Sequence, residues 1–173
     1  KSILDTFKNK YYFYKKNYKT HTEAMMYLLN KCFSSHNYDV VFNTNLDDYY
    51  LNNRFEKQLE CINNGYDLCS TLMTYIKDEN GSDKPMKKWT SDMLNLKSKN
   101  YYIETDLINV EINKNNNIIN HSCVCFTKRL WLGYDKYDNL LRYRNDKPFE
   151  DLSLWKRAIT NNFNITIINE NLI

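Results

Sequence analysis

Short apolar runs alternate with helix-forming patterns along most of this 173-residue chain. Four runs predict buried strands because they place apolar residues between polar turns: residues 39–43, 68–76, 122–127 and 163–169. Three segments repeat apolar residues at helical spacing: residues 20–33, 53–63 and 149–161. Helices that alternate with buried strands predict an α/β protein with a mostly parallel mixed sheet, flanking helices and right-handed crossovers.

The other segments carry weaker signals. Residues 10–16 are aromatic and basic and predict a further strand. Residues 82–120 are expected to be irregular apart from a short helix near 90–97. Since neither an internal repeat nor a linker is found, we expect a single domain over residues 1–173. With only three Gly and two Pro, Asn and Asp are expected to form the turns.

Charge and hydropathy argue against two classes of protein. The chain has 24 Lys and Arg residues and 21 Asp and Glu residues, which give a formal net charge of +3. This charge is too small to indicate the dense basic patch that nucleic-acid-binding proteins usually carry. The aromatic and basic segment 8–19 leaves an RNA-stacking surface open as an alternative. No apolar run approaches the roughly 18 residues of a membrane span, so no transmembrane segment is expected.

The cysteines predict reduced thiols rather than a disulfide framework or a zinc site. There are five, an odd number, and no C-x-x-C pair supplies metal-ligand spacing: Cys32, Cys61, Cys69, Cys123 and Cys125. Buried thiols of this kind are typical of a reducing compartment. Because no signal-like pattern opens the chain, a cytoplasmic location is expected.

The first candidate site is Asp47-Asp48, which follows the predicted strand 39–43. Ligands of open α/β sheets bind outside the carboxyl ends of strands. Two carboxylates there, with Asn45 beside them, suit a hard divalent cation that also holds phosphate oxygens. A solvated turn that caps the next helix is the alternative, because Asp favours both positions.

The second candidate site is the start of the helix predicted over 149–161. Glu150 or Asp151 could act as a general base there, although acids in a first helical turn are also stabilised by the helix dipole alone. Trp155 follows Asp151 by one helical turn and could stack on a sugar ring or pack in the core. His121, before the strand 122–127, could ligate, titrate, donate a hydrogen bond or serve a structural role.

Four motifs in order resemble the family 2 glycosyltransferases of GT-A fold. DVVFNTNLDDYYLNNRFEKQ (39–58) is similar to the family's metal-site strand, acidic motif and following helix. INHSCVCFTKR (119–129) resembles its I-x-H-x-S strand, and GYD (133–135) and PFEDLSLWKRA (148–158) resemble its G-Y-D and E-D-x-x-L-W segments. The resemblance spans residues 39 to 173 and implies a GT-A-like, Rossmann-like fold.

The resemblance also implies an activity and roles for single residues. It implies metal-dependent, inverting, hexosyltransferase-like transfer from a nucleotide-diphosphate sugar, most readily a UDP-sugar, to a hydroxyl of a glycan, protein or lipid. Asp47 corresponds to the aspartate that binds Mn²⁺ or Mg²⁺, with Asp48 and Asn45 beside it at the donor diphosphate. Asp151 corresponds to the catalytic base, with Glu150 before it. His121 and Trp155 are candidates for the acceptor side.

One departure from the family pattern is large. Family members begin with a β-α-β unit that forms much of the nucleotide pocket, and the first residues of this chain correspond to the segment after that unit. The chain is therefore expected to represent about the last two-thirds of the catalytic domain. A non-catalytic remnant of the same fold, acting as a carbohydrate-binding or assembly module, is the alternative, and Asn45 in place of the motif's first Asp favours it.

Overall fold

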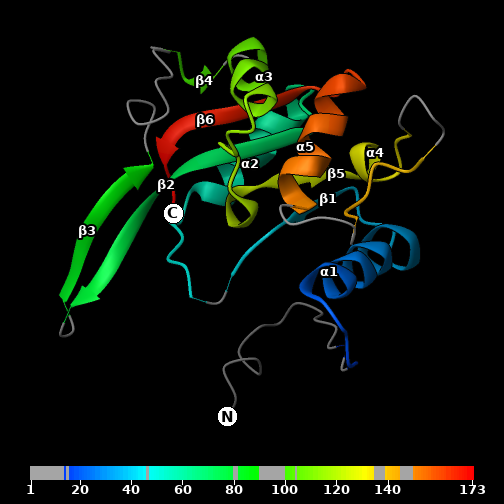
Figure 1. The fold of residues 1–173 in the computed structure, drawn as a ribbon, viewed down its shortest axis with the longest axis horizontal. Helices are drawn as coiled ribbons and strands as arrows, with labels where there is room; N and C mark the ends of the chain where they lie inside the picture. The colour runs from blue at the N-terminus through cyan, green and yellow to red at the C-terminus, as the bar shows by residue number, and fades with distance from the viewer. Residues whose placement is uncertain are drawn as a thin grey trace.

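The computed structural model describes residues 14, 16–45, 47–79, 82–89, 100–103, 105–134, 139–144 and 150–173. These residues form a mixed α/β structure built on one sheet (Figure 1). The predicted helix 90–97 and most of the predicted strand 10–16 lie outside the described residues.

Five strands form the sheet in the order β1-β5-β2-β6-β4, and a sixth, β3, pairs with β2 as a hairpin. Their bounds are Val40–Phe42 (β1), Leu68–Glu79 (β2), Ser82–Trp89 (β3), Tyr102–Ile103 (β4), Cys125–Thr127 (β5) and Ile165–Asn171 (β6). The four predicted buried strands are therefore present, although the one predicted from 122 starts at Cys125.

The prediction of a mostly parallel sheet is wrong. Among the strand pairs that the described residues form, only β2 and β6 run parallel, with Leu68 opposite Ile165, whereas the β1–β5, β5–β2, β2–β3 and β4–β6 pairs are antiparallel. The cause is β5, which lies between β1 and β2 and runs opposite to both. Apolar patterning marks which residues are buried in a strand and carries no information on its direction.

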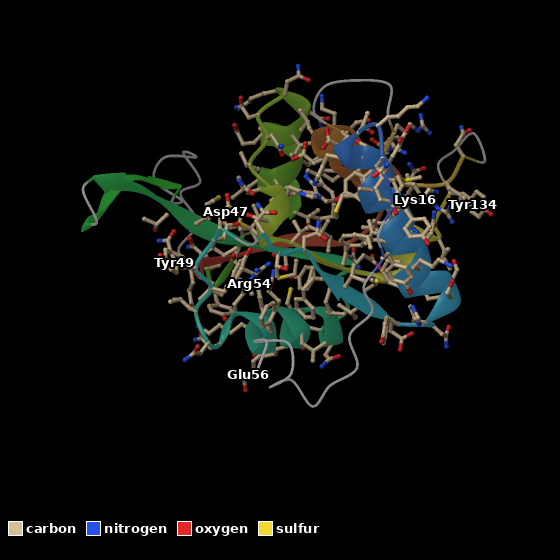
Figure 2. All side chains as sticks on the ribbon, turned by 90° about the horizontal axis from the view of Figure 1, so that it is seen from below. Lys16, Asp47, Tyr49, Arg54, Glu56 and Tyr134 are labelled. Carbon is tan, nitrogen blue, oxygen red and sulfur yellow. The ribbon has the colours of Figure 1, made fainter. Side chains whose placement is uncertain are left out.

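Helices cover both faces of the sheet. The helices and short helical turns are α1 (His21–Asn30), η2 (Lys31–Ser35), α2 (Arg54–Asn63), α3 (Thr105–Asn113), η3 (His121–Cys123), α4 (Lys128–Trp131) and α5 (Glu150–Thr160). Figures 1 and 2 show α2 on one face and α3 and α5 on the other. The three predicted helices are confirmed, and the Thr20 side chain caps α1 by accepting a hydrogen bond from the Glu23 N–H at 3.1 Å.

The region 82–120 is more ordered than expected, since it holds β3, β4 and α3. Ile108 and Ile112, one helical turn apart, are the fully buried residues of α3. Asn and β-branched residues lower the helix propensity of this segment. Packing against α5 and β6 stabilises α3 instead.

Successive side chains of the central strands point to opposite faces of the sheet and pack into two separate hydrophobic cores. Leu68, Phe126 and Ile167 belong to the larger core, which α1, α3 and α5 cover. An adjacent residue in each of these strands faces the smaller core beneath α2: Cys69, Cys125 and Ile168. Because both faces of the sheet are covered, the strands are apolar at successive positions, as their sequences indicated.

No helix among the described residues combines the length and the hydropathy that crossing a bilayer requires.

Candidate active site

The turn after β1 carries the three residues predicted to bind the donor. Asn45 and Asp47 are exposed, and Asp48 is half-buried. The Tyr50 hydroxyl closes the turn, because it accepts a hydrogen bond from the Asn45 N–H at 2.6 Å and lies 3.0 Å from the Asn45 carbonyl and 3.3 Å from Asp48 Oδ2. We call Asn45, Asp47 and Asp48 the acidic turn. It presents Asp47 to solvent and restrains Asp48.

A buried arginine at the start of α2 supports the acidic turn from below (Figure 2). Arg54 is completely buried, its Nη2 donates to the carbonyls of Asn43 and Ser122 at 2.9 Å, and its guanidinium lies 4.6 Å from the Tyr50 ring centroid. Burial lowers the pKa of Arg54, which still leaves the side chain charged at neutral pH. Arg54 thus fixes the carboxyl end of β1 against the segment that contains His121.

Gln58, one helical turn after Arg54, extends this support. Its Oε1 accepts from Arg54 Nε at 2.9 Å, and its Nε2 donates to the carbonyls of Cys69 and Cys123 at 3.0 and 2.7 Å. Arg54 and Gln58 therefore connect the end of β1, the strand β2 and the chain entering β5. We call these two side chains the Arg–Gln pair.

The two predicted catalytic carboxylates lie in the first turn of α5 and differ in environment. Both oxygens of Asp151 accept hydrogen bonds at 2.7 Å, one from Asn117 Nδ2 and one from the Leu152 N–H. Glu150 Oε1 lies 3.9 Å from His21 Nδ1. Asp151 is held in one orientation but keeps lone pairs that can accept a proton, whereas Glu150 faces an exposed histidine.

His121 connects these carboxylates to the interior. Its ring centroid is 5.6 Å from that of His21 and 5.5 Å from that of Tyr143, both edge-on. Burial lowers the pKa of His121, and the neighbouring His21 lowers it further, against the opposing effect of Asp151 and Glu150. His121 is therefore neutral at pH 7 and offers one donor and one acceptor nitrogen. We call His21, His121, Glu150 and Asp151 the carboxylate–histidine cluster.

Trp155 does not belong to an exposed surface. It is completely buried, its Nε1 donates to the Ile119 carbonyl at 3.3 Å, and its ring lies 6.3 Å from that of Tyr143. The expected acceptor-side role is corrected accordingly, because a buried ring offers no face on which a sugar could stack.

Asn43 joins the acidic turn to the carboxylate–histidine cluster. It follows β1 directly, its carbonyl accepts from Arg54, and its side chain donates to the Tyr143 hydroxyl at 3.5 Å. Tyr143 in turn contacts His121. Burial raises the pKa of Cys123 to about 12, and the charge of Asp48 adds to that rise, so the acidic turn also acts electrostatically on the segment after His121.

Within the part of the chain that the structure describes, no three His, Cys, Asp or Glu side chains lie close enough together to hold a metal ion. A Mg²⁺ ion at a phosphate site commonly takes one or two protein carboxylates and completes its shell with water and phosphate oxygens. The exposed carboxylate of Asp47 fits that smaller requirement.

Several residues of this region were missed at the level of sequence. Asn43, Tyr143 and His21 carried no motif, and Asn117 lies in an Asn-rich tract without a distinctive signal. The Arg–Gln pair was hidden by a competing signal, since Phe55, Leu59 and Ile62 of the same helix are apolar at helical spacing and predict a different buried face.

Comparison of the chain with protein-family models, with curated proteins and with solved structures finds no match in any of the three.

Proposed function

We propose that this chain is a metal-dependent inverting glycosyltransferase domain with a GT-A-like fold. One observation carries the proposal: Asn43, which lies at the carboxyl end of β1 two residues before the acidic turn, is hydrogen-bonded to Tyr143, and the Tyr143 ring contacts His121 of the carboxylate–histidine cluster. A cation-binding group and a proton-accepting group beside one strand end are what sugar transfer from a nucleotide diphosphate requires.

The acidic turn is the proposed donor site. Asp47 would hold Mn²⁺ or Mg²⁺, and Asp48 and Asn45 would lie beside the diphosphate of a UDP-sugar. The cation supplies Lewis-acid stabilisation of the departing diphosphate. The exposure of Asp47 supports this role, and so does the fixed backbone that Tyr50 and Arg54 provide around it.

The first turn of α5 is the proposed acceptor-activating site. Asp151 or Glu150 takes the proton of the acceptor hydroxyl as its oxygen forms a bond to the anomeric carbon. The bond from that carbon to the diphosphate oxygen breaks, and the nucleoside diphosphate leaves with the electron pair. A single displacement inverts the anomeric centre. Neutral His121 is a candidate hydrogen-bond partner for the acceptor, a glycan, protein or lipid hydroxyl.

A thermal-shift panel of UDP-, GDP- and CMP-sugars, with and without Mn²⁺, tests the donor site. We expect a UDP-sugar to raise the melting temperature only with Mn²⁺, and Asp47→Ala to abolish that rise. Asp106→Ala, which removes an exposed carboxylate from α3, is the matched control and should leave the rise intact. An equal rise in Asp47→Ala, or none with any donor, contradicts the proposal.

A non-catalytic carbohydrate-binding module of the same fold is the second candidate. Two observations favour it: Asn45 provides an amide where the family motif has an acid, and both Asp151 oxygens already accept hydrogen bonds. This candidate predicts sugar binding that is insensitive to EDTA and to Asp47→Ala, with no release of nucleoside diphosphate when donor and acceptor are mixed.

A further inference from the structure

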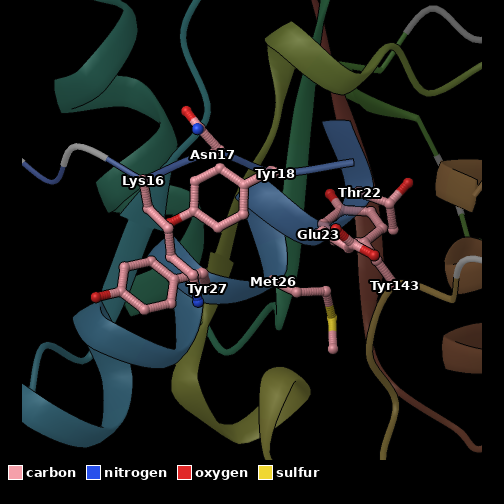
Figure 3. A pocket seen from close by; sticks show the side chains of 8 residues that line it. All are labelled: Lys16, Asn17, Tyr18, Thr22, Glu23, Met26, Tyr27 and Tyr143. Carbon is pink, nitrogen blue, oxygen red and sulfur yellow. The ribbon is translucent and has the colours of Figure 1, made fainter. Parts of the chain in front are cut away.

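A cavity of about 400 Å³ lies between residues 16–18 and α1 (Figure 3). Its lining includes Lys16, Asn17, Tyr18, Glu23 and Tyr27, with Tyr143 at the side of the interior. Lys16, Asn17 and Tyr18 belong to the aromatic and basic segment 8–19, which has no role in the proposed donor site or at the proposed catalytic base. The volume is within the range of small-molecule sites.

The lining combines aromatic faces with polar groups. The rings of Tyr18 and Tyr27 lie 5.7 Å apart, and Lys16 Nζ lies over both, 5.6 and 5.2 Å from their centroids. The Tyr18 hydroxyl is buried and has no hydrogen-bond partner among the described residues. A buried hydroxyl without a partner is unfavourable, and a ligand that offers a hydroxyl would relieve it.

The charges of the lining favour a neutral ligand. Lys16 and Glu23 contribute one positive and one negative charge, and the Glu23 carboxylate already accepts from the Lys19 N–H at 2.9 Å. A phosphorylated or carboxylated ligand would meet no excess of positive charge here.

The cavity adjoins the carboxylate–histidine cluster. Thr22, which also lines it, directly follows His21, and His21 lies 3.9 Å from Glu150. Tyr143 contacts the ring of His121. A ligand in the cavity would therefore lie beside the groups assigned to proton transfer.

We propose that this cavity binds a neutral pyranose ring of the acceptor, with its apolar face against Tyr18 and Tyr27 and its hydroxyls on the polar lining. This inference rests on the proposed transferase function. A nucleobase could also stack on the rings, but its polar atoms lie in one plane along its edges. A polyol presents hydroxyls in several directions, which suits Tyr18, Asn17 and Glu23 arranged around the space.

Ligand-observed saturation-transfer NMR with a panel of neutral methyl glycosides tests the cavity, with uridine and adenosine as competing ligands. We expect at least one glycoside to bind in EDTA. Tyr27→Ala should weaken it about tenfold by removing one stacking face, and Tyr18→Phe several-fold by removing the hydroxyl alone. Tyr134→Ala, an exposed tyrosine outside the cavity lining, should change nothing.

Several outcomes overturn the inference. They are no glycoside binding, binding that neither cavity variant alters, or a nucleoside that binds more tightly with the same dependence on Tyr27. If the Tyr27→Ala variant does not fold, Tyr18→Phe still tests the inference, because it removes only a hydroxyl and keeps the ring. The Mn²⁺-dependent rise in melting temperature with a nucleotide-sugar separates the two proposals. If that rise is seen but no glycoside binds, only the proposed sugar site in the cavity is refuted. If a glycoside binds but no nucleotide-sugar raises the melting temperature, the transferase proposal is refuted and the cavity remains a sugar-binding site.

Discussion

At the scale of single residues, Arg54 has the greatest structural consequence. A buried guanidinium is costly unless its donors are paired, and here Gln58 pairs Nε while the carbonyls of Asn43 and Ser122 pair Nη2. The buried Nη1 has no hydrogen-bond partner among the described residues. Arg54 positions the backbone after β1 as well as stabilising the fold. Arg54 determines where the chain turns after β1, and the acidic turn begins at that point.

Arg54→Met is therefore expected to destabilise the protein by about 2–4 kcal/mol, because it leaves the buried carbonyls of Asn43 and Ser122 without a donor. Urea unfolding measures this difference. Lys114→Met is the matched control, since Lys114 is exposed and makes a surface ion pair with Glu111, so its loss should cost less than about 0.5 kcal/mol. Equal effects of the two variants would contradict the role given to Arg54.

The lowered pKa of His121 predicts a dependence of stability on pH. In the unfolded chain His121 takes up a proton near 6.5, while the folded protein resists protonation. The unfolded state thus binds more protons as the pH falls below about 6.5, and the free energy of unfolding falls until the pH passes the lowered folded pKa. This stability is fully present above the unfolded pKa. His121→Gln should flatten the acid side of the profile.

His21→Gln provides the matched test, because it removes the second cause of the shift and keeps His121. The pKa of His121, followed by NMR titration, should move upward toward its ordinary value. A pKa that stays in place would show that burial alone sets it.

At the scale of elements, α4 and the chain after it depend on close packing at Gly133. A Cβ at this position would lie 2.4 Å from Phe163 Cζ and 3.2 Å from the carbonyls of Arg129 and Leu130. Since Phe163 precedes β6 and lies under the Arg129 guanidinium, 5.0 Å from its ring centroid, its movement is restricted. The glycine allows α4 to approach the start of β6.

Gly133→Ala is expected to destabilise the protein by about 1–3 kcal/mol, measured by urea unfolding. The double variant Gly133→Ala with Phe163→Leu should recover part of that loss, because the shorter side chain removes the nearest contact. Gly65→Ala gives a contrast: its Cβ would meet no atom within 4 Å, and its cost, about 1 kcal/mol, comes from a φ of +94°. No recovery in the double variant would argue against steric conflict with Phe163.

The elements that sequence patterns predicted well are those with strong periodicity. The helix α2 and the apolar run of β2 both lie where expected, at Arg54–Asn63 and from Leu68 onward. The buried face of α2 is formed by Arg54, Gln58 and Cys61, however, whereas its apolar Phe55 and Leu59 are exposed. Strand direction and α3 were missed because both depend on tertiary contacts: β5 gains its place from pairing with Val41 and Leu68, and α3 from packing on α5.

At the scale of the whole molecule, the five cysteines are all free, and four of them are completely buried. Burial raises the pKa of Cys32 and Cys69, and that of Cys123 to about 12. Only Cys32 is partly accessible, so it is the thiol expected to react in the native state.

Brief treatment with iodoacetamide, followed by intact-mass measurement, should add one group to the native protein and five after denaturation. Cys32→Ser should reduce the native count to none, and a reducing agent should leave the melting temperature unchanged. Two or more groups on the native protein would contradict the burial of the sheet cysteines.

The sequence indicated part of the candidate site. Asp47, Asp48, Glu150, Asp151 and His121 were found from their places relative to strands and helices. The residues around them could not be predicted from the sequence. Asn117 donates a hydrogen bond to Asp151, 34 residues away, and Asn43 donates one to Tyr143, 100 residues away. Such pairings are defined only in the folded chain. The proposed glycosyltransferase function also predicts that Asp47 and Asp151 converge at the strand ends with a cleft between them.

The order of the sheet also has a consequence for synthesis on the ribosome. Strand β6 is the parallel neighbour of β2 and the strand to which β4 is hydrogen-bonded, although it lies about a hundred residues after the start of β2. A nascent chain that has not yet released residues 165–171 exposes an edge of β2 and leaves β4 without its pairing strand. Such edges are templates for association with other chains. The growing polypeptide is therefore expected to be most prone to association before β6 pairs with β2 and β4.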